Sequence, residues 1–408
     1  MAAVQTVPVL ETVAAAQRRL LATLMPLESE TVGLDDALGR ILAARVCATR
    51  DLPGFDNSAM DGYAVRAVDV ARASEAHAVS LTVIGESRAG RDAPPLSAGC
   101  AIRIATGAPM PQGADTVVRQ EDALRRGRDV LVAVAVTAGT FVRRRGEDVG
   151  AGQDVIECGR DLTPIDIGAA AALGHHQLRV GRRPRVGVFA TGDELVGAGT
   201  AVSGSRVVDS NSPLLMAATR EAGGEPAFLG VAEDNPDALR RLLRADEHDI
   251  LVSSAGVSVG DHDHVRGVVA ELGEVSTWRV AMRPGKPMLI GRVGRALYFG
   301  LPGNPVSASV TFELFVRPAI RRLQGATEVM RRRIPVLLGE TVEKPAELET
   351  YTRALLGIVA DALPVATSSG NQGSHMLGSL VDADCLLVLP AGRSQFSEGS
   401  VVDAIPLR

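Results

Sequence analysis

The chain has 408 residues, 46% of them apolar and 22% charged, and its 48 acidic side chains against 43 basic ones leave a formal charge of -5. This balance argues against a nucleic-acid partner, because binding to a phosphate backbone needs an excess of Lys and Arg. No apolar run approaches the roughly 18 residues of a membrane span, and no basic region followed by an apolar stretch opens the chain. We therefore expect a cytoplasmic protein with several cores and no membrane partner.

The cysteines are dispersed and form no CxxC pair, so neither a zinc site nor a disulfide framework is indicated. We expect all four to be small, buried hydrophobic side chains. They are Cys47, Cys100, Cys158 and Cys385.

The N-terminal third begins with helical spacing and changes to β texture. Residues 7–24 carry apolar side chains at helical spacing, and a second short helix is expected at 35–44. From 52 to 145, short β-rich runs alternate with Gly, Pro and Asp, which predicts a small β domain. An Ala-rich helix is expected at 161–173.

After Pro184 the sequence alternates between strand and helix, which predicts a mostly parallel sheet with helices on both faces. The expected strands and helices follow one another at 185–190, 213–222, 227–231, 236–244 and 250–253. Ser212, Asn235 and Asn304 each precede a proline and are expected to cap a helix. Beyond Arg331 a final β domain of about 80 residues is expected.

Three Gly-rich loops follow the predicted strands of this region, at 191–194, 253–261 and 300–305. In an open α/β sheet, ligands bind where such loops converge, and helix N-termini there can hold an anion. Any one of these loops could be only a good turn, but three in equivalent places predict a phosphate-bearing ligand. Pro287 after Lys286 excludes a P-loop, and the first of these strands lacks the dinucleotide fingerprint.

Carboxylates on and near these loops suggest a magnesium site, since hard oxygen ligands suit that ion beside a phosphate. An Asp beside Gly is also a common turn residue. The carboxylates in question are Asp56, Asp61, Glu147, Asp148, Asp193, Glu194, Asp261 and Asp263.

Two short motifs partly match other kinds of site, a zinc site and the active site of a serine hydrolase. Residues 262–264 read His-Asp-His, but no third histidine is near enough to complete a zinc site. Residues 256–260 match the G-x-S-x-G elbow of serine hydrolases. Ser258 would then need a later Asp and His, and only His375 follows this loop, in the predicted final domain.

Seven motifs, in order along nearly the whole chain, resemble those of the MoeA family of molybdopterin molybdenumtransferases, which is related to the E domain of gephyrin. They are residues 55–66, 105–115, 146–148, 191–194, 256–261, 283–287 and 300–305.

The resemblance implies an α/β multidomain fold in an elongated homodimer. A discontinuous helical domain (1–46 plus 146–182) would carry an inserted small β domain (47–145). A central three-layer α/β domain with a mostly parallel sheet (183–328) and a C-terminal β barrel (329–408) would follow.

The resemblance also implies the reaction. With magnesium (Mg2+) and molybdate, adenylylated molybdopterin would be hydrolysed, AMP released and molybdenum inserted. The expected partners are an upstream adenylyltransferase and downstream molybdoenzymes. An alternative is a catalytically weakened paralogue that acts as a pterin-binding or scaffold protein.

Site residues carry over from the family position by position. The implied catalytic set is Asp61, Thr106, Asp148, Glu194, Asp234 and Asp263. Of these, the implied metal ligands are Asp61, Glu194 and Asp263. The implied substrate contacts are Arg143, Ser258, Gly260, Arg279, Arg283, Lys286, Pro302, Asn304, Pro305, Arg353 and Ser374. The family site is a cleft between the central domain of one subunit and the inserted domain of its partner, so the two groups would meet only in the dimer.

Three positions depart from the family pattern. Arg279 and Arg283 stand where lysine is usual, and Ala255 stands where glycine is usual. Arg keeps the charge but presents a planar fork instead of a point charge. The chain has only two lysines against 41 arginines, so a general preference for Arg explains the first two changes. A methyl group at Ala255 needs a negative φ or additional room.

Overall fold

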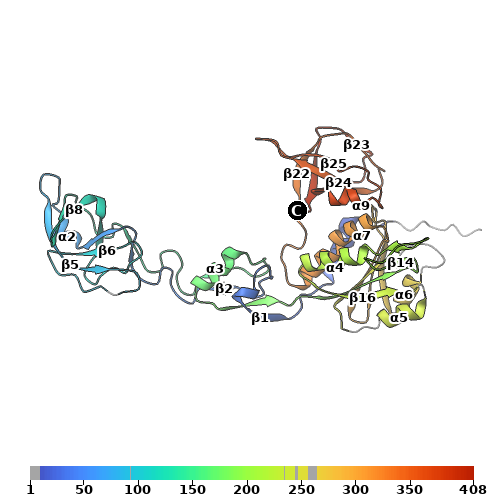
Figure 1. Cartoon of the computed structure of the whole chain (residues 1–408), viewed down its shortest axis with the longest axis horizontal. Coiled ribbons are helices and arrows are strands. Elements are labelled where there is room, and N and C mark those ends of the chain that lie inside the picture. Colours follow the sequence, from blue (N-terminus) through green and yellow to red (C-terminus); the bar gives the residue numbers. More distant parts are fainter. Residues whose placement is uncertain (1–9, 92, 234, 244–246, 256–263) are drawn as a thin grey trace, which may run out of the picture.

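The computed structural model describes residues 10–91, 93–233, 235–243, 247–255 and 264–408. The chain is elongated (Figure 1). A small β domain lies at one end, and the α/β domain with the C-terminal barrel lies at the other. A segment built around α3 (Pro164–Ala172) stands between them.

The inserted domain contains a six-stranded sheet in the order β7-β4-β6-β5-β9-β8. Its strands are β4 (Gly62–Val65), β5 (Val79–Ser87), β6 (Cys100–Ile104), β7 (Thr116–Arg119), β8 (Ala123–Arg126) and β9 (Asp129–Val132). Short elements complete the domain: β3 (Asn57–Ser58), β10 (Val142–Arg143), α2 (Ala67–Val70) and η2 (Gln120–Asp122). The predicted β texture is confirmed. Gly62 is required in β4, because a Cβ there would lie 2.0 Å from the Val118 carbonyl oxygen.

The middle segment is assembled from two distant stretches of sequence. β1 (Ser29–Gly33) pairs antiparallel with β12 (Gln177–Gly181), and β2 (Val46–Cys47) pairs with β11 (Asp154–Ile156). Its core combines both stretches, with Leu42, Val46, Ile156, Leu162 and Leu178 buried together.

The prediction of a helix at 35–44 is wrong. Only one 3-10 turn forms there, η1 (Leu34–Asp36). Gly39 follows with a φ of +70°, and Ile41 and Leu42 then form bridges to Asp161 and Val180. Backbone pairing with the distant stretch therefore replaces the local helix.

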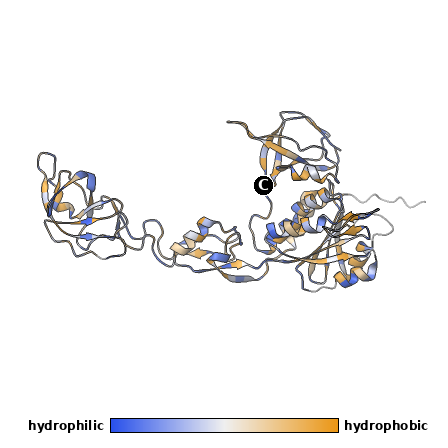
Figure 2. Ribbon diagram, in the orientation of Figure 1, coloured by the Kyte–Doolittle hydropathy of each residue, from blue (hydrophilic) through white to orange (hydrophobic). Residues whose placement is uncertain are grey.

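The central domain has a sheet in the order β16-β13-β17-β21-β20-β18. Its strands are β13 (Arg185–Thr191), β16 (Glu225–Ala232), β17 (Ile250–Ser254), β18 (Gly273–Arg279), β20 (Pro287–Val293) and β21 (Ala296–Leu301). The first four in the spatial order are parallel and the last two antiparallel, so the predicted mostly parallel sheet is confirmed. These strands are largely hydrophobic (Figure 2).

Helices cover both faces of this sheet. α5 (Pro236–Leu243) and α6 (Val265–Leu272) pack against one face, with Leu239, Leu251 and Val269 in the core there. The other face contacts α4 (Asn211–Glu221), α7 (Pro305–Thr311), the π-helical turn η3 (Phe312–Val316) and α8 (Arg317–Leu323). β14 (Leu195–Val196) and β15 (Val207–Val208) form a small parallel two-stranded ribbon.

The N-terminal helix belongs to this central core. α1 (Val13–Ala22) buries Val13, Ala16 and Leu20 in the same cluster as β13 and α8. We expected residues 1–46 to belong to the helical segment, and for α1 that assignment is wrong. The hydrophobic face of α1 predicts a helix but does not specify which core it joins.

The predicted helix caps differ in outcome. Asn235 caps α5 as expected, since its Oδ1 accepts from the Ala238 N–H at 2.8 Å. α4 begins at Asn211, two residues before the expected proline, and the Asp209 carboxylate accepts from the Ser212 N–H at 3.0 Å. Asn304 precedes α7 but makes no capping bond with its side chain.

The C-terminal domain is a closed five-stranded barrel. Its strands are β22 (Ile334–Leu338), β24 (Glu349–Gly357), β25 (Val365–Ser368), β26 (Cys385–Leu389) and β28 (Val401–Pro406). β24 pairs with both β25 and β26, which closes the ring. β19 (Met282–Arg283), from the central domain, lies beside β24 and pairs with it in parallel. The small elements are β23 (Val342–Glu343), β27 (Gln395–Phe396) and α9 (Leu377–Val381).

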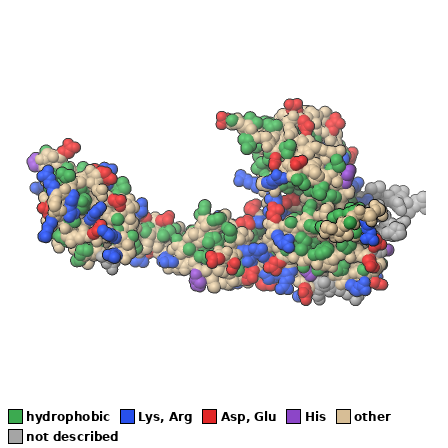
Figure 3. Space-filling view, viewed as in Figure 1, with side chains coloured by type: hydrophobic (Ala, Val, Ile, Leu, Met, Phe, Trp, Pro, Cys, Tyr) green, Lys and Arg blue, Asp and Glu red, His purple; other side chains and the backbone are tan. Residues whose placement is uncertain are grey.

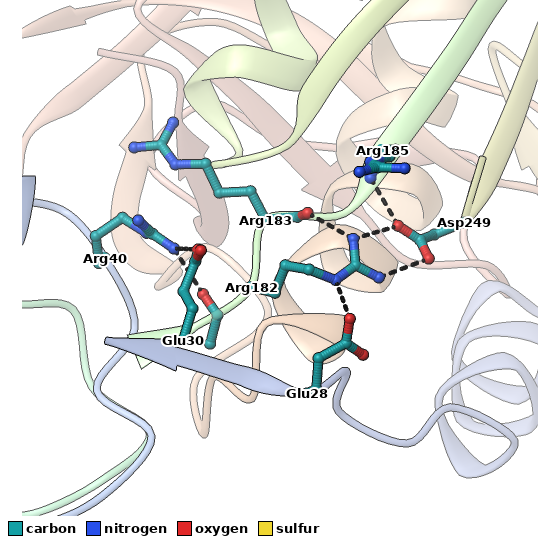
Figure 4. A network of polar contacts seen from close by, with 8 residues as sticks. Glu28, Glu30, Arg40, Arg182, Arg183, Arg185 and Asp249 are labelled. Carbon is teal, nitrogen blue, oxygen red and sulfur yellow. Dashed lines mark hydrogen bonds and ion pairs between the residues drawn. The ribbon is translucent and has the colours of Figure 1, made fainter. Parts of the chain in front are cut away.

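A polar network joins the middle segment to the central domain (Figure 4). Arg182, just after β12, donates to Glu28 at 2.7 Å and to both carboxylate oxygens of Asp249 at 2.9 Å. The Arg185 N–H donates to the same Asp249 at 2.8 Å. Beside it, Arg40 pairs with Glu30 and donates to the Gly181 carbonyl at 2.9 Å.

The cysteines differ from expectation. All four are free, but only Cys385 is buried, Cys158 is exposed, and the other two are intermediate. Within the described ranges, the structure has no helix of the length and apolar character needed to cross a membrane.

Candidate functional site

Three loops leave the same edge of the central sheet. β13, β17 and β21 are adjacent and parallel, so the residues that follow Thr191, Ser254 and Leu301 lie side by side. The predicted convergence is confirmed for the first and third loops and for the start of the second. The rest of the second loop lies outside the described residues. The hydrolase-like motif and the predicted site residues Ser258, Gly260 and Asp263 therefore lie outside them too.

A cavity of about 340 Å³ opens beside the third loop. It brings together five side chains predicted from the sequence: Arg283, Lys286, Pro302, Asn304 and Ser374. The amide of Asn304 donates to the Ser374 hydroxyl at 2.8 Å, which explains why it does not cap α7. The wall of the cavity therefore includes the central domain and a loop of the barrel.

Two cations border this cavity. Arg283 ends β19, and Lys286 directly precedes β20. Between them Gly285 has a φ of +101°, and a Cβ there would lie 2.5 Å from the Thr311 methyl group, so the turn needs glycine. A guanidinium fork and an ammonium point charge at one cavity favour an oxyanion ligand.

Asn211 holds two of the loops together and was missed by the sequence analysis. It is 8% exposed, and its Nδ2 donates to the Ser254 hydroxyl and to the Gly303 carbonyl, both at 2.7 Å. Its Oδ1 is buried without a hydrogen-bond partner among the described residues. No local signal in the sequence marks Asn211, because its partners lie on loops 43 and 92 residues away.

The first loop borders a separate cavity of about 500 Å³. Gly192, Asp193, Arg206, Glu233 and Asn235 line it. Glu194 is exposed, and its carboxylate lies over Gly192, where a Cβ would be 2.6 Å away. Asp234, predicted as a catalytic residue, lies outside the described residues.

The inserted domain places Asp61 and Thr106 together, as predicted for one site. Asp61 Oδ1 accepts from the Thr106 N–H at 2.6 Å and from its hydroxyl at 2.9 Å. These bonds, the backbone one foremost, lower the pKa of the Asp61 carboxyl, so that the exposed group is ionised at neutral pH. Figure 3 shows Lys and Arg side chains gathered over this domain.

Arg143 and Asp148 are also exposed. Arg143 is in β10, where it is paired in register with Asn57 of β3. The Asp148 N–H donates to the Leu52 carbonyl at 3.1 Å. The adjacent Arg144 instead bonds Asp56 at 2.7 Å. The N–H of the next residue and Arg144 itself lower the pKa of Asp56, which is therefore engaged within the domain.

Arg353 does not line the cavity with the other predicted substrate contacts. It is fully buried, and its guanidinium donates to the Ser379 hydroxyl at 2.8 Å and to the carbonyls of Asn371 and Gly373 at 2.9 and 3.1 Å. Burial lowers its pKa. Arg353 therefore positions the loop that carries Ser374, as well as Gln372, which also lines the cavity.

The remaining predicted contacts lie near this cavity. Arg279 ends β18 opposite Pro287, the neighbour of Lys286. Pro305 is the first residue of α7. Ser307, in the first turn of α7, lines the cavity and was not predicted.

Within one chain, the two predicted groups of catalytic residues are far apart. β6, which precedes Thr106, and β14, which follows Glu194, lie at opposite ends of the molecule (Figure 1). Among the described residues, no group of three or more His, Cys, Asp or Glu side chains could hold a metal ion. The expected metal ligands Asp61 and Glu194 therefore do not meet in the monomer.

Three family models match in order along the chain. The MoeA N-terminal region (domain I and II) matches residues 11–174, a probable molybdopterin-binding domain matches 187–322, and the MoeA C-terminal region (domain IV) matches 335–407. Together they span most of the sequence.

Curated relatives match over nearly their whole length. A molybdopterin molybdenumtransferase of Nostoc sp. is 38% identical over 93% of this chain and 89% of its own. Molybdopterin molybdenumtransferase 2 of Mycobacterium tuberculosis is 38% identical over 91% of this chain and 93% of its own.

A solved structure has the same architecture. The molybdopterin biosynthesis MoeA protein of Pyrococcus horikoshii matches with a TM-score of 0.83 and 31% identity, over 98% of this chain and all of that one. Full-length similarity in both sequence and fold leads to one conclusion. The chain belongs to the MoeA family.

Proposed function

We propose that this protein is a molybdopterin molybdenumtransferase, which inserts molybdenum from molybdate into adenylylated molybdopterin and releases AMP. Two relatives that carry this name are 38% identical over more than nine tenths of the chain. The observation that carries the proposal is the cavity beyond the strand ends, where Arg283, Lys286, Asn304 and Ser374 gather. An adenylyltransferase would supply the substrate in the cytoplasm, and molybdoenzymes would receive the product.

The proposed substrates match the chemistry of this cavity. Molybdate and the phosphates of the adenylylated pterin are oxyanions, which accept hydrogen bonds from a guanidinium, an ammonium, an amide or a hydroxyl. As AMP departs, negative charge develops on its phosphate, and Arg283 and Lys286 would stabilise it. Asn304, bonded to Ser374, would orient the anion.

Magnesium dependence is part of the proposal. The predicted ligands Asp61, Glu194 and Asp263 supply the carboxylate oxygens that Mg2+ prefers, and the lowered pKa of Asp61 keeps that group ionised. Bound magnesium would neutralise charge on the substrate phosphates. Asp61 and Glu194 do not meet within one chain, so the proposal includes a homodimer in which the inserted domain of one subunit faces the central domain of the other.

The test is release of AMP by the purified protein from adenylylated molybdopterin. We expect release that requires both molybdate and magnesium and that stops with a chelator. Lys286→Met should lower the rate roughly 100-fold, because an oxyanion contact is lost where charge develops. Arg125→Met, an exposed position in the inserted domain, is the control.

Two results would contradict the proposal. The first is no AMP release over a wide range of molybdate concentrations, with the pterin still bound, as the scaffold alternative requires. The second is equal rates for Lys286→Met and Arg125→Met, which would remove the cavity from the reaction.

A further inference from the structure

The segment between β15 and α4 is bonded to all three of the loops that follow the central strands. Through the ribbon of β14 and β15, the Val207 N–H donates to the carbonyl of Glu194, the last residue of the first loop, at 2.9 Å. The Asp209 N–H donates to the Val196 carbonyl at 2.8 Å. Two residues later, the side chain of Asn211 reaches the second and third loops. One short stretch of chain therefore connects three loops that are distant in the sequence.

Asn211 directs its amide N–H groups to both of these loops. Its Nδ2 has two N–H bonds, and it donates to the Ser254 hydroxyl and to the Gly303 carbonyl, both at 2.7 Å. The residue is 8% exposed, so water competes little for either bond. The two loops are close at this point, because a Cβ on Gly303 would lie 3.3 Å from the Ala255 methyl group. Asn211 therefore fixes the second and third loops relative to each other where they leave the sheet.

The bond to Gly303 extends the effect of Asn211 to the cavity beside the third loop. The carbonyl of Gly303 and the N–H of Asn304 belong to one planar peptide group, so a bond that holds the carbonyl restricts the rotation of the whole group. The Asn304 side chain lines the cavity and donates to the Ser374 hydroxyl at 2.8 Å. Asn211 therefore supports the third-loop half of this hydrogen-bonded pair.

The two cations of the cavity are held by other parts of the chain. Arg283 ends β19, which pairs with β24 of the barrel, and Lys286 directly precedes β20. The bonds of the Asn211 amide go to the second and third loops instead. Loss of that amide would therefore keep the charges that attract an oxyanion and disturb the pair that orients it.

We infer that Asn211 is a positioning residue for the proposed reaction. It holds the third loop so that Asn304 and Ser374 stay aligned with the oxyanion on which charge develops. The inference rests on the proposed function, in which this pair orients the anion. A contact that is misaligned in the transition state lowers kcat, whereas KM is kept when the contacts of the bound ground state remain.

Steady-state release of AMP by the full-length protein tests the inference. We expect Asn211→Ala to lower kcat roughly 100-fold and to change KM for molybdate less than about threefold, because both cations remain. Leu215→Ala is the matched control, since Leu215 is buried one turn along the same helix and packs in the central core. The cavity that this variant creates also lowers stability, but kcat should stay near the wild-type value wherever the variant is folded.

Hydrogen exchange gives a second readout, which needs no activity. The Ala255 N–H donates to the Leu301 carbonyl at 2.9 Å, and the Val306 N–H donates to the Ser374 carbonyl at 3.3 Å, so these two amides report on the second and third loops. Relative to the amides of β13, both should exchange at least about fivefold faster in Asn211→Ala than in Leu215→Ala.

A milder variant keeps the inference testable if Asn211→Ala does not fold. Ser254→Ala removes one of the two acceptors of the Asn211 amide and leaves the bond to Gly303. It should lower kcat roughly tenfold, again with little change in KM. A wild-type kcat in Ser254→Ala would contradict the inference.

Two outcomes for Asn211→Ala would overturn the inference. In the first, its kcat and its amide exchange match those of Leu215→Ala. In the second, KM for molybdate rises and kcat is unchanged, which would make Asn211 a binding residue. AMP release by the wild-type protein is measured separately: if release occurs and Asn211→Ala behaves like its control, the inference fails and the proposed function stands. Absence of release from the wild type would remove the proposed function itself.

Discussion

Ala255 has a left-handed backbone although it carries a Cβ. A methyl group there needs a negative φ or additional room, but the φ is +70° and the Ala255 methyl lies 3.3 Å from where a Cβ on Gly303 would be. Left-handed backbone is unfavourable for any residue with a Cβ, by roughly 1–2 kcal/mol. The second loop therefore begins at a strained residue.

We predict that Ala255→Gly stabilises the protein. The strain at a φ of +70° disappears, and the gain should be about 1 kcal/mol after the added flexibility of the unfolded chain is subtracted. Denaturant unfolding measures it. Ala171→Gly, at an exposed position of α3 with helical backbone, should lose about 1 kcal/mol. Destabilisation of similar size in both variants would contradict the assigned strain.

Arg353 leads to a second prediction at this scale. Arg353→Lys keeps the charge but cannot reach all three acceptors on Asn371, Gly373 and Ser379, so buried carbonyls lose their donor. We expect a loss of about 2–4 kcal/mol and faster hydrogen exchange at residues 371–374. Arg125→Lys is the exposed control. Unchanged exchange in that loop would show that Arg353 does not position it.

Among the elements, the sequence predicted strands and buried helices well. It failed where pairing with a distant stretch of backbone determines the local structure. The strands expected at 185–190 and 250–253 form, and their continuous apolar runs suit a parallel sheet that is covered on both faces. The helix expected at 35–44 does not, because Ile41 and Leu42 pair with a stretch more than a hundred residues away.

The candidate site was predictable to a similar degree and for a similar reason. The family resemblance implied Arg283, Lys286, Asn304 and Ser374 as substrate contacts, and these residues share one cavity. The resemblance did not reveal that Arg353 is buried, since its acceptors come from a loop fixed only by the barrel. Nor did it reveal Asn211, whose partners lie on two other loops.

The network around Asp249 makes the joint between middle segment and central domain sensitive to acid. Burial raises the pKa of Asp249, but hydrogen bonds from Arg182 and the Arg185 N–H outweigh it and hold the pKa below its ordinary value of 3.8. Because the folded state has the lower pKa, the carboxylate contributes stability above about pH 4. That contribution is lost as the pH falls through 3.8 toward the folded pKa.

We therefore predict that β1 and β12 exchange amide hydrogens faster, relative to the barrel strands, as the pH falls from 5 to 3. Asp249→Asn should cost the joint about 1–3 kcal/mol at pH 7 and remove most of the pH dependence in that window. Asp403→Asn, on the barrel, is the control. If amide exchange in β1 and β12 keeps the same ratio to exchange in the barrel strands at every pH, this role of Asp249 is excluded.

For the whole molecule, the separation of Asp61 from Glu194 makes the proposed dimer testable. We expect Asp61→Asn and Glu194→Gln each to be inactive in AMP release, with folds intact, because Asn can still accept from Thr106. Mixed and allowed to exchange subunits, the two variants should recover about a quarter of wild-type activity. Half of the dimers would then be mixed, each with one complete site.

The mixing experiment also defines its own refutation. If both residues acted within one chain, no mixed dimer would contain a complete site and activity would stay absent. Two samples of Asp61→Asn, mixed in the same way, control for the handling.

The β2–β11 pair sets where the inserted domain is attached. Cys47 and Asp154 are partners in that pair, so the polypeptide departs and returns at a single point. Evolution could lengthen, shorten or exchange everything between them without rethreading the rest of the chain. The position of the inserted domain could thereby change while the central cavity beside Arg283 and Lys286 stays as it is.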